Sequence, residues 1–468
     1  MPQRPALSGP AAAALVFAAS GAVLVVEILA IRMLAPYVGL TLETYTAAIG
    51  VVLAGIAIGS AAGGRAADGV DPARLLGPLL IAGGALTVIT VPLVRGLGET
   101  VRGVPDFGAI FLSAVAFLPP AAVLSAVTPA TAKLRLSDLR ETGTVVGRLS
   151  AWATAGALTG TFLTGFVLVP LLPTPATVLG LGAMLAAAGI ALSLRMRALS
   201  RAAAAGNAAL VAVLALASAA AGTTCHAETK YHCARIVAGA GGLDLYLDDL
   251  RHAHVKPDPR RLELGYVRWL GAVLDATAPR EAVFLGGGGF SLPRYLAATQ
   301  PGARAEVLEI DPRLVDLARE RLGLRDEPWL TIRTGDARTL LRDRPARSAD
   351  IVVGDAFGGR SIPWHLATRE FVADVQRVLR PDGVYALNLI DHGGLGLLRA
   401  ETATLLEAFD HVSVISGAGS GNFVLVASGS PLPALDLDDA RARDGRAVAA
   451  GARVLTDDRA PADQLLTR

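Results

Sequence analysis

The residues best placed for chemistry stand at the ends of four short apolar segments in the second half of the chain. They are glycines and acids, namely Gly286 to Gly289, Glu309 with Asp311, Asp336, and Asp355. Bare glycine backbone lets a ligand approach closely, and an acid after the second strand of a nucleotide-binding sheet commonly accepts hydrogen bonds from ribose hydroxyls. A glycine run alone also fits a plain turn, but four polar strand ends in succession predict a nucleoside-binding edge.

These segments belong to a longer alternation of strands and helices. The expected strands are 282–288, 305–311, 330–336, 350–356, 383–390, 411–417 and 422–428. Helices are expected between the first six strands, and the one over 312–323 has a proline in its first turn. Only a short glycine-rich link joins the last two strands, as in a hairpin. We therefore predict a doubly wound, Rossmann-like α/β sheet with an antiparallel edge, whose ligands bind beyond the carboxyl ends of the strands.

A smaller unit precedes this sheet. Residues 230–255 predict a few antiparallel strands, and a helix begins over 265–274. We expect a small β-strand subdomain with its linking helix over 223–275 and a Rossmann-like catalytic domain over 276–468. His252 and His254 alternate along one of these strands and so face one side, but a metal pair lacks a third convincing ligand, and we predict no metal site.

The first half of the chain has the composition of a membrane protein. Of 468 residues, 52% are hydrophobic and 18% are charged, and the mean hydropathy is +0.49. Soluble domains carry about 25% charged residues. Seven stretches are long and apolar enough to span a bilayer, near 11–33, 45–64, 74–94, 107–130, 149–171, 175–195 and 203–222. We expect residues 1–222 to form a transmembrane domain of about seven helices. The net charge of +2 argues against nucleic acid as a partner.

Basic residues in the loops predict an orientation in the membrane. One side carries ten of them, Arg4, Arg65, Arg74, Lys133, Arg135, Arg140, Arg148, Arg195, Arg197 and Arg201, and the other carries Arg95 and Arg102. The positive-inside rule places the larger group in the cytoplasm. Seven spans that begin inside end outside, which favours an extracytoplasmic soluble half. An even span count, through a missed or re-entrant segment, would return that half to the cytoplasm.

Two further features concern the membrane half and its junction with the rest. Glu27 lies inside the first span, where an ionisable residue is a functional candidate. The alternative is a structural pair with Arg32 or with a polar group on another helix. The two cysteines of the chain, Cys225 and Cys233, fit either a disulfide in an oxidising compartment or two buried free thiols.

The chain resembles the spermidine synthase (polyamine aminopropyltransferase) family, specifically its membrane-fused bacterial branch. The soluble half carries the resemblance in "ETKYHCARIV", "LYLDDLRHAHV", "GYVRWL", "FLGGGGFSLPRYL", "LEIDP", "GDART", "DIVVGDAFGG" and "LTDDRAPAD". The membrane half is similar to that branch in "EILAIRMLAPYVG" and "AGIAIGSAAGGRAAD". The resemblance implies that S-adenosylmethionine or its decarboxylated form is a substrate, that an aminopropyl group is transferred, and that methylthioadenosine is released.

The resemblance also implies roles on the nucleoside side of the site. Beside the glycine loop, Glu309 is expected to hold the ribose, while Asp336 and Ala337 contact the adenine. Tyr231 and His232 occupy the place of a Tyr-Gln pair near the nucleoside. This side of the family pattern is kept.

The amine side is altered. Tyr266 takes the place of an active-site tyrosine, and Asp355 matches the first acid of the family's DSSD motif, which helps to deprotonate the attacking amine. The loop aspartate that grips the aminopropyl amine is Gly289 here, and the second acid of the DSSD motif is Gly358. A late tyrosine of the family is also missing from 415–423. A polyamine is a multiple cation that needs carboxylates and aromatic faces, so these changes predict an altered acceptor site.

Other polar residues are candidates for the substrate side. His252 matches a polar position of the family. Replacement acids are available in two acidic pairs, Asp248 with Asp249 and Asp457 with Asp458. The alternative for the second pair is a turn before a helix.

Together these features predict a membrane-bound enzyme that transfers or eliminates the aminoalkyl arm of an S-adenosylmethionine-type nucleoside. Its expected partners are that small-molecule nucleoside, an amine and the lipid bilayer. Two alternatives stay open: a lyase or cyclase of S-adenosylmethionine that uses no polyamine, and a non-catalytic membrane transporter that senses a nucleoside. The oligomeric state, a homodimer included, stays open as well.

Overall fold

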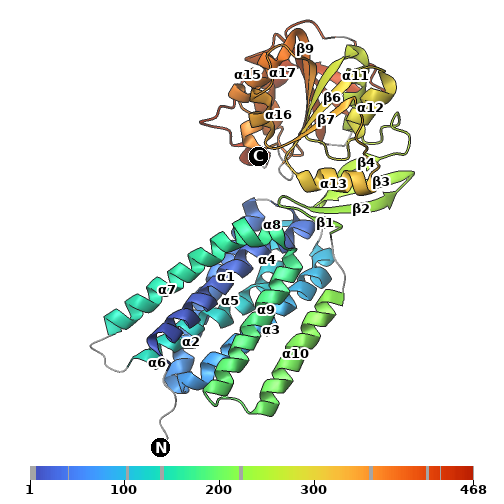
Figure 1. Ribbon diagram of the computed structural model, residues 1–468. Helices are drawn as coiled ribbons and strands as arrows, with labels where there is room; N and C mark the ends of the chain where they lie inside the picture. The colour runs from blue at the N-terminus through green and yellow to red at the C-terminus, as the bar shows by residue number, and fades with distance from the viewer. Residues whose placement is uncertain are drawn as a thin grey trace, which may run out of the picture. The chain divides into compact units, whose positions relative to one another are not determined.

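The computed structural model of the protein describes residues 7–40, 42–101, 105–136, 142–220, 225–357, 362–417, 421–432 and 434–466. The chain divides into two compact units, 1–233 and 234–468, which Figure 1 shows coloured from blue to green and from green to red.

The N-terminal unit consists of long apolar helices. They are α1 (Gly9–Val38), α2 (Leu42–Gly69), α3 (Pro72–Val101), α4 (Pro105–Ala116), α5 (Leu118–Ser125), α6 (Val127–Arg135), α7 (Thr142–Leu163), α8 (Val169–Leu171), α9 (Thr174–Arg195) and α10 (Arg201–Ala220), with a π-helical turn over Thr164–Leu168. Among the described residues, six helical spans are long and apolar enough to cross a membrane. A bent helix pair makes a seventh if it counts as one span. Each of the seven expected spans coincides with one of these segments.

The bent pair consists of Phe107–Ala116 and Leu118–Arg135, which meet at 41°. Its break has a local cause, because Pro119 and Pro120 occupy the start of α5. Proline has no backbone N–H to donate, and its ring clashes with the preceding turn. The pair is therefore either one broken span or a re-entrant segment.

Small residues let the helices of this unit pack closely. Gly59 and Gly63 of α2 lie against the backbone of Ala122 and Ala126, so close that a Cβ atom on either glycine would overlap the facing residue. Such glycines bring helix backbones together in lipid, where burial of apolar surface drives no association. The small-residue run over 55–64 therefore serves helix packing, as the sequence predicts.

The polar residues of α1 differ from expectation. Arg32 forms an ion pair with Glu228 of the short strand β1 (Ala227–Glu228) at 3.4 Å, and it donates to Thr174 Oγ1 at 3.2 Å. Pairing of Arg32 with Glu27 is therefore wrong, because Arg32 reaches out of the span to polar partners. Within the described part of the chain, Glu27 has no hydrogen bond or ion pair.

Near β1, the two cysteines form a disulfide, Cys225–Cys233. The alternative of two free thiols is thus not what the structure shows.

The C-terminal unit is built on a twisted sheet. Its described strands are β5 (Glu281–Leu285), β6 (Arg304–Glu309), β7 (Leu330–Thr334), β8 (Ala349–Gly354), β9 (Leu379–Ile390), β10 (His411–Gly417), β11 (Asn422–Ser428) and β12 (Ala440–Asp444). They lie in the order β12-β10-β11-β9-β8-β5-β6-β7. The five strands from β9 to β7 are parallel, and the other three are antiparallel to their neighbours. This confirms the predicted Rossmann-like sheet with an antiparallel edge.

Helices cover both faces of this sheet (Figure 1). They are α11 (Gly265–Thr277), α12 (Ser291–Thr299), α13 (Pro312–Arg321), α14 (Ala337–Arg342), α15 (Arg369–Val378), α16 (Gly396–Leu406), α17 (Gly445–Ala449) and α18 (Ala462–Leu466), with a 3-10 turn over Trp364–Leu366. Because both faces are covered, the central strands are apolar throughout and show no alternation. Edge strand β12 was not predicted, since "ARARD" has no apolar run and most of it is exposed.

A small antiparallel sheet precedes the large one. It contains β2 (Cys233–Gly239), β3 (Gly242–Leu247) and β4 (Leu250–Val255). The register shifts between Leu245 and Tyr246, whose partners Ala253 and Arg251 leave His252 of β4 as the extra residue, so the regular alternation expected of His252 and His254 is interrupted. His254 of β4 is buried against the carboxylate of Asp244, at 2.7 Å. Asp248 and Asp249 lie at the turn between β3 and β4.

Candidate active site

The glycine loop after β5 is held directly against the neighbouring strands. Gly286 donates its N–H to Leu308 O at 2.9 Å, and Asp355 donates its N–H to Leu285 O at 2.9 Å. Gly286 has φ +92°, and a Cβ atom there would lie 2.6 Å from the carbonyl oxygen of Asp355. Gly288 also has positive φ, +48°, but faces open space. The loop therefore needs glycine for its conformation and leaves room for a ligand beside Gly288.

Glu309, at the end of β6, anchors this loop. Its Oε2 accepts the Gly287 N–H at 2.7 Å and its Oε1 accepts the Asp311 N–H at 2.9 Å. Burial raises the pKa of the Glu309 carboxyl, while the two backbone N–H groups act in the opposite direction. Each oxygen keeps lone-pair capacity for a further donor, such as a hydroxyl. Asp311 is itself buried and caps α13 by accepting the Arg313 N–H at 3.0 Å.

Asp336 ends the next connection and caps α14, with its Oδ1 accepting the Thr339 N–H at 2.9 Å. Its second oxygen lies 2.9 Å from Nε2 of His365. Partial burial acts to raise the pKa of Asp336, but the hydrogen bonds from Thr339 and His365 outweigh it and lower this pKa. Asp336 is therefore an ionised acceptor. Ala337 follows it as the first, buried residue of α14.

Asp355 follows β8 and is held by two side chains. Asn388 of β9 donates to its Oδ1 at 2.8 Å, and the hydroxyl of Tyr266 on α11 lies 3.5 Å from its Oδ2. The same hydroxyl lies 3.2 Å from the carbonyl oxygen of His252. Burial raises the pKa of Asp355 to about 6, although both hydrogen bonds lower it. A carboxylate with this pKa can take up a proton near neutral pH, as a general base must.

Gly289 stands where the family has a loop aspartate, and the space beside its Cα atom is filled by apolar side chains. A Cβ atom on Gly289 would lie 2.7 Å from Ala253 Cβ and 2.8 Å from Val255 Cγ2, both on β4. Contacts this short require the neighbouring strand to move, so a carboxylate has no room here. The loss of the acid is therefore accompanied by apolar packing.

The chain is similar in sequence to known proteins. No family model matches the chain. It is 30% identical over 187 residues to a polyamine aminopropyltransferase of Vibrio vulnificus, covering 38% of this chain and 60% of that protein. It is also 30% identical over 133 residues to a polyamine aminopropyltransferase of Chromobacterium violaceum, covering 28% of this chain and 51% of that protein. The C-terminal unit is spermidine synthase-like.

The matches thus span only about half to three fifths of these relatives. A crystal structure of a probable spermidine synthase from Corynebacterium glutamicum is 28% identical and covers 49% of this chain and 95% of its own, with a TM-score of 0.46.

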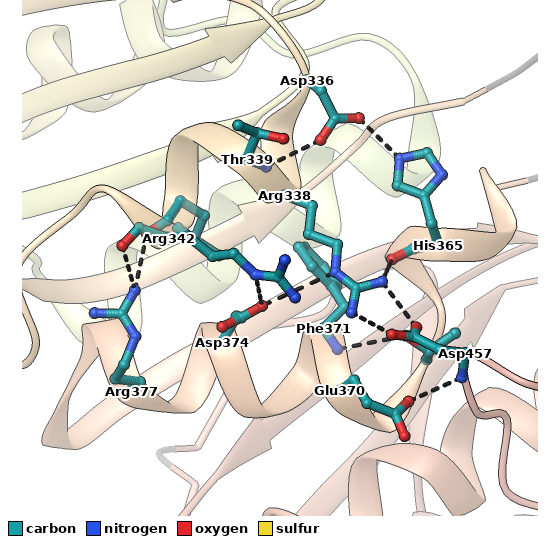
Figure 2. Close-up of polar contacts among 12 residues, drawn as sticks. Asp336, Arg338, Thr339, Arg342, His365, Glu370, Phe371, Asp374, Arg377 and Asp457 are labelled. Carbon is teal, nitrogen blue, oxygen red and sulfur yellow. Dashed lines mark hydrogen bonds and ion pairs between the residues drawn. The ribbon is translucent and has the colours of Figure 1, made fainter.

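Figure 2 shows where the spermidine synthase-like unit places one acid expected on the substrate side. Asp457 accepts both ends of the Arg338 guanidinium, at 2.8 and 2.7 Å, and the hydroxyl of Thr368 at 2.7 Å. The hydrogen bond and charge of Arg338 hold the pKa of Asp457 down at about 2. Its backbone N–H is bound by Glu370. Asp457 therefore ties its turn to α14 and α15. These bonds favour a structural role for Asp457 over direct contact with a substrate.

Two expected site residues belong to the N-terminal unit, and one further position lies outside the described residues. Tyr231 and His232 belong to the N-terminal unit, where their N–H groups donate to Thr229 Oγ1 at 3.0 and 2.9 Å. Their contact with a nucleoside stays a prediction. Asp458 is exposed in the turn beside Asp457, and Gly358 lies outside the described residues.

Three side chains of the site were missed from the sequence. Asn388 and His365 each touch a predicted acid, and Asn422 donates to Asn388 Oδ1 at 3.2 Å. A polar residue in the otherwise apolar strand "GVYALNLI" was the available signal for Asn388. His365 gave none, because the segment that carries it forms only a single 3-10 turn.

Proposed function

We propose that the C-terminal unit binds an S-adenosylmethionine-type nucleoside and transfers or eliminates its aminoalkyl group, releasing methylthioadenosine. One observation carries the proposal: Asp355, poised with a pKa of about 6, lies directly against the glycine loop that Glu309 anchors. A nucleoside bound by that loop would have its 5′ substituent near the only acid of the family's amine side that keeps its place.

The chemistry proposed for the residues follows from their bonding. Glu309 accepts from the ribose, Asp336 accepts from the base, and the loop backbone near Gly288 approaches the nucleoside. Asp355 takes the proton of an attacking amine, so that a neutral nitrogen can attack the carbon next to the sulfonium. Tyr266 and Asn388 orient this carboxylate. A fixed geometry of this kind favours in-line attack.

Polyamines are expected to be poor acceptors. The relatives are named polyamine aminopropyltransferases, but a polyamine carries several positive charges, and in this chain the loop position 289 has no room for an acid. This observation favours a second candidate reaction, in which S-adenosylmethionine itself is cleaved or cyclised and no amine acceptor is needed.

Product analysis separates these possibilities. The purified full chain is incubated with S-adenosylmethionine or its decarboxylated form, with and without a panel of amines, and the products are identified by mass spectrometry. Methylthioadenosine formed only with an amine supports transfer. Methylthioadenosine formed without any amine supports the lyase or cyclase. Tight nucleoside binding with no product under any condition would leave only the sensing role.

We also propose that the unit faces the outside of a bacterial inner membrane. The disulfide Cys225–Cys233 supports this, because disulfides persist in oxidising compartments, as does the ten-to-two division of loop charges. The bent pair Phe107–Ala116 and Leu118–Arg135 supports the opposite if it is re-entrant, since six spans would return the chain to the cytoplasm.

A further inference from the structure

A pocket of about 610 Å³ lies in the C-terminal unit, between α16 and the segment that leads from α17 into α18. One wall is a single face of α16, since Gly396, Arg399 and Ala400 stand at positions three and four residues apart. The other walls come from residues between 451 and 465. None of the residues proposed to bind the nucleoside lines this pocket. Pockets of this size hold small metabolites.

The charged side chains of the pocket are all positive. Its lining includes three arginines, Arg399, Arg453 and Arg459, and none of its described lining residues is acidic. Asp457 stands close to Arg459 in the sequence, but its carboxylate binds Arg338 instead (Figure 2). The three guanidinium groups therefore have no acid in the lining to neutralise them.

These guanidinium groups have donors to spare. Arg399 donates to Ala450 O at 2.6 Å, a bond that uses only part of its capacity. Among the residues that the structure describes, the side chains of Arg453 and Arg459 have no hydrogen bond or ion pair. A guanidinium presents its N–H groups in a rigid fork that matches the oxygens of a carboxylate or a phosphate. Exposed at the pocket, these groups can receive such an oxyanion.

The remaining lining is mostly apolar and is contributed by Ala400, Val454, Leu455, Pro461 and Leu465. An inorganic ion would leave this surface uncovered, whereas each methylene group buried against it adds to the affinity of a ligand. We propose that the pocket binds an amphiphilic oxyanion, a phosphate monoester or a carboxylate with an apolar chain. The arginines bind its head and the apolar lining binds its chain. This inference is independent of the proposed nucleoside reaction.

The alternative is that the three arginines are ordinary surface cations that only water solvates. The pocket would then bind an oxyanion no better than any other pair of exposed arginines does. The chain offers such a pair in Arg321 and Arg325, which are exposed and whose side chains have no partner among the described residues.

The test titrates hexyl phosphate into the full chain in a non-ionic detergent and measures binding by calorimetry. The wild type should bind hexyl phosphate at least about tenfold more tightly than inorganic phosphate or hexanol, because only hexyl phosphate has both head and chain. Joint Arg453→Gln and Arg459→Gln replacement should weaken binding by about tenfold or more. Lysine at both positions keeps the charge without the fork and should cost less. Joint Arg321→Gln and Arg325→Gln replacement is the matched control and should bind as the wild type does.

A second titration distinguishes a soluble ligand from a lipid. The full chain is reconstituted in phosphatidylcholine vesicles that contain either phosphatidic acid or, at matched surface charge, phosphatidylglycerol. Weaker binding of hexyl phosphate with phosphatidic acid identifies a lipid headgroup as the occupant, and equal binding identifies a soluble anion.

Two results would overturn the inference, whether or not the nucleoside reaction is found. One is hexyl phosphate that binds the wild type no more tightly than hexanol and inorganic phosphate do. The other is unchanged affinity in the glutamine variant of Arg453 and Arg459. Thermal unfolding checks that this variant is folded, and if it is not, the comparison of the three ligands on the wild type still decides.

Discussion

Asn388 Nδ2 donates a 2.8 Å hydrogen bond to Asp355 Oδ1, joining the ends of two adjacent parallel strands. The bond has a direct consequence for chemistry, since Asn388 stabilises the ionised carboxylate while burial opposes it. Asn422, on the antiparallel strand β11, in turn donates to Asn388 Oδ1 at 3.2 Å. The proposed base is thus oriented from the antiparallel edge of the sheet.

The pH dependence of methylthioadenosine formation should follow Asp355. The carboxyl must be ionised to accept a proton, and its pKa is about 6. The rate should therefore fall about tenfold for each pH unit below about 6 and level off above it. Asn388→Leu removes a donor to the carboxylate and so raises the pKa, which should move the midpoint upward by about one pH unit. A pH-rate profile of both proteins checks this, and an unmoved midpoint would mean that another group controls the rate.

Restoring the family's loop acid should fail for steric reasons. Gly289→Asp forces its side chain against Ala253 and Val255, and overpacking of this kind costs about 1–3 kcal/mol. Gly289→Ala should destabilise as well, because the Cβ atom alone makes the short contacts. Thermal unfolding measures both variants, and product assays should show no gain with putrescine. A stable Gly289→Asp protein with efficient spermidine formation would contradict the assignment of this position.

Glu309→Ala should remove most of the thermal stabilisation by methylthioadenosine. A ligand that binds only the folded state raises its apparent stability. Glu309 holds the loop through Gly287, and it is the residue proposed to accept from the ribose. Asp326→Ala, at an exposed acid of a distant ion pair, serves as the control and should keep the full shift. A shift that survives in Glu309→Ala would show that the ribose contact is assigned to the wrong residue.

The disulfide predicts the compartment of the C-terminal unit. In intact cells, Cys225 and Cys233 should resist alkylation by a membrane-permeant maleimide until a reductant is added. Their joint replacement by serine should lower the free energy of unfolding by about 2–3 kcal/mol, as for a short loop. Alkaline phosphatase and green fluorescent protein fused after Arg468 give independent readouts. Free thiols together with a fluorescent, phosphatase-inactive fusion would place the unit in the cytoplasm.

Much of the fold follows from the sequence because its signals are periodic. Segments that become buried are apolar, so the long apolar stretches and the strand–helix alternation can be recognised from the local sequence. Strand β12 was missed because an exposed edge strand such as "ARARD" buries too little apolar surface to show in the pattern. The pairing of Arg32 with Glu228, rather than Glu27, was missed because it joins residues 196 positions apart.

The site was predictable where it lies at strand ends and obscure where it depends on side-chain orientation. The positions of Glu309, Asp336 and Asp355 at one edge of the sheet could be predicted because parallel strands bring their carboxyl ends together. The ion pair between Asp457 and Arg338 depends on how two segments far apart in the sequence pack together. The exclusion of an acid at position 289 depends on the packing of β4, which no motif records.

The most direct test of the account is Asp355→Asn, assayed for both methylthioadenosine formation and nucleoside binding in the same preparation. The amide keeps the shape of the side chain but cannot take up a proton, so product formation should fall by at least about 100-fold. The affinity for methylthioadenosine, measured by calorimetry, should stay within about threefold of the wild type, because the residues proposed to bind the nucleoside are Glu309 and Asp336. Wild-type rates of product formation in this variant would contradict the assignment of Asp355 as the base.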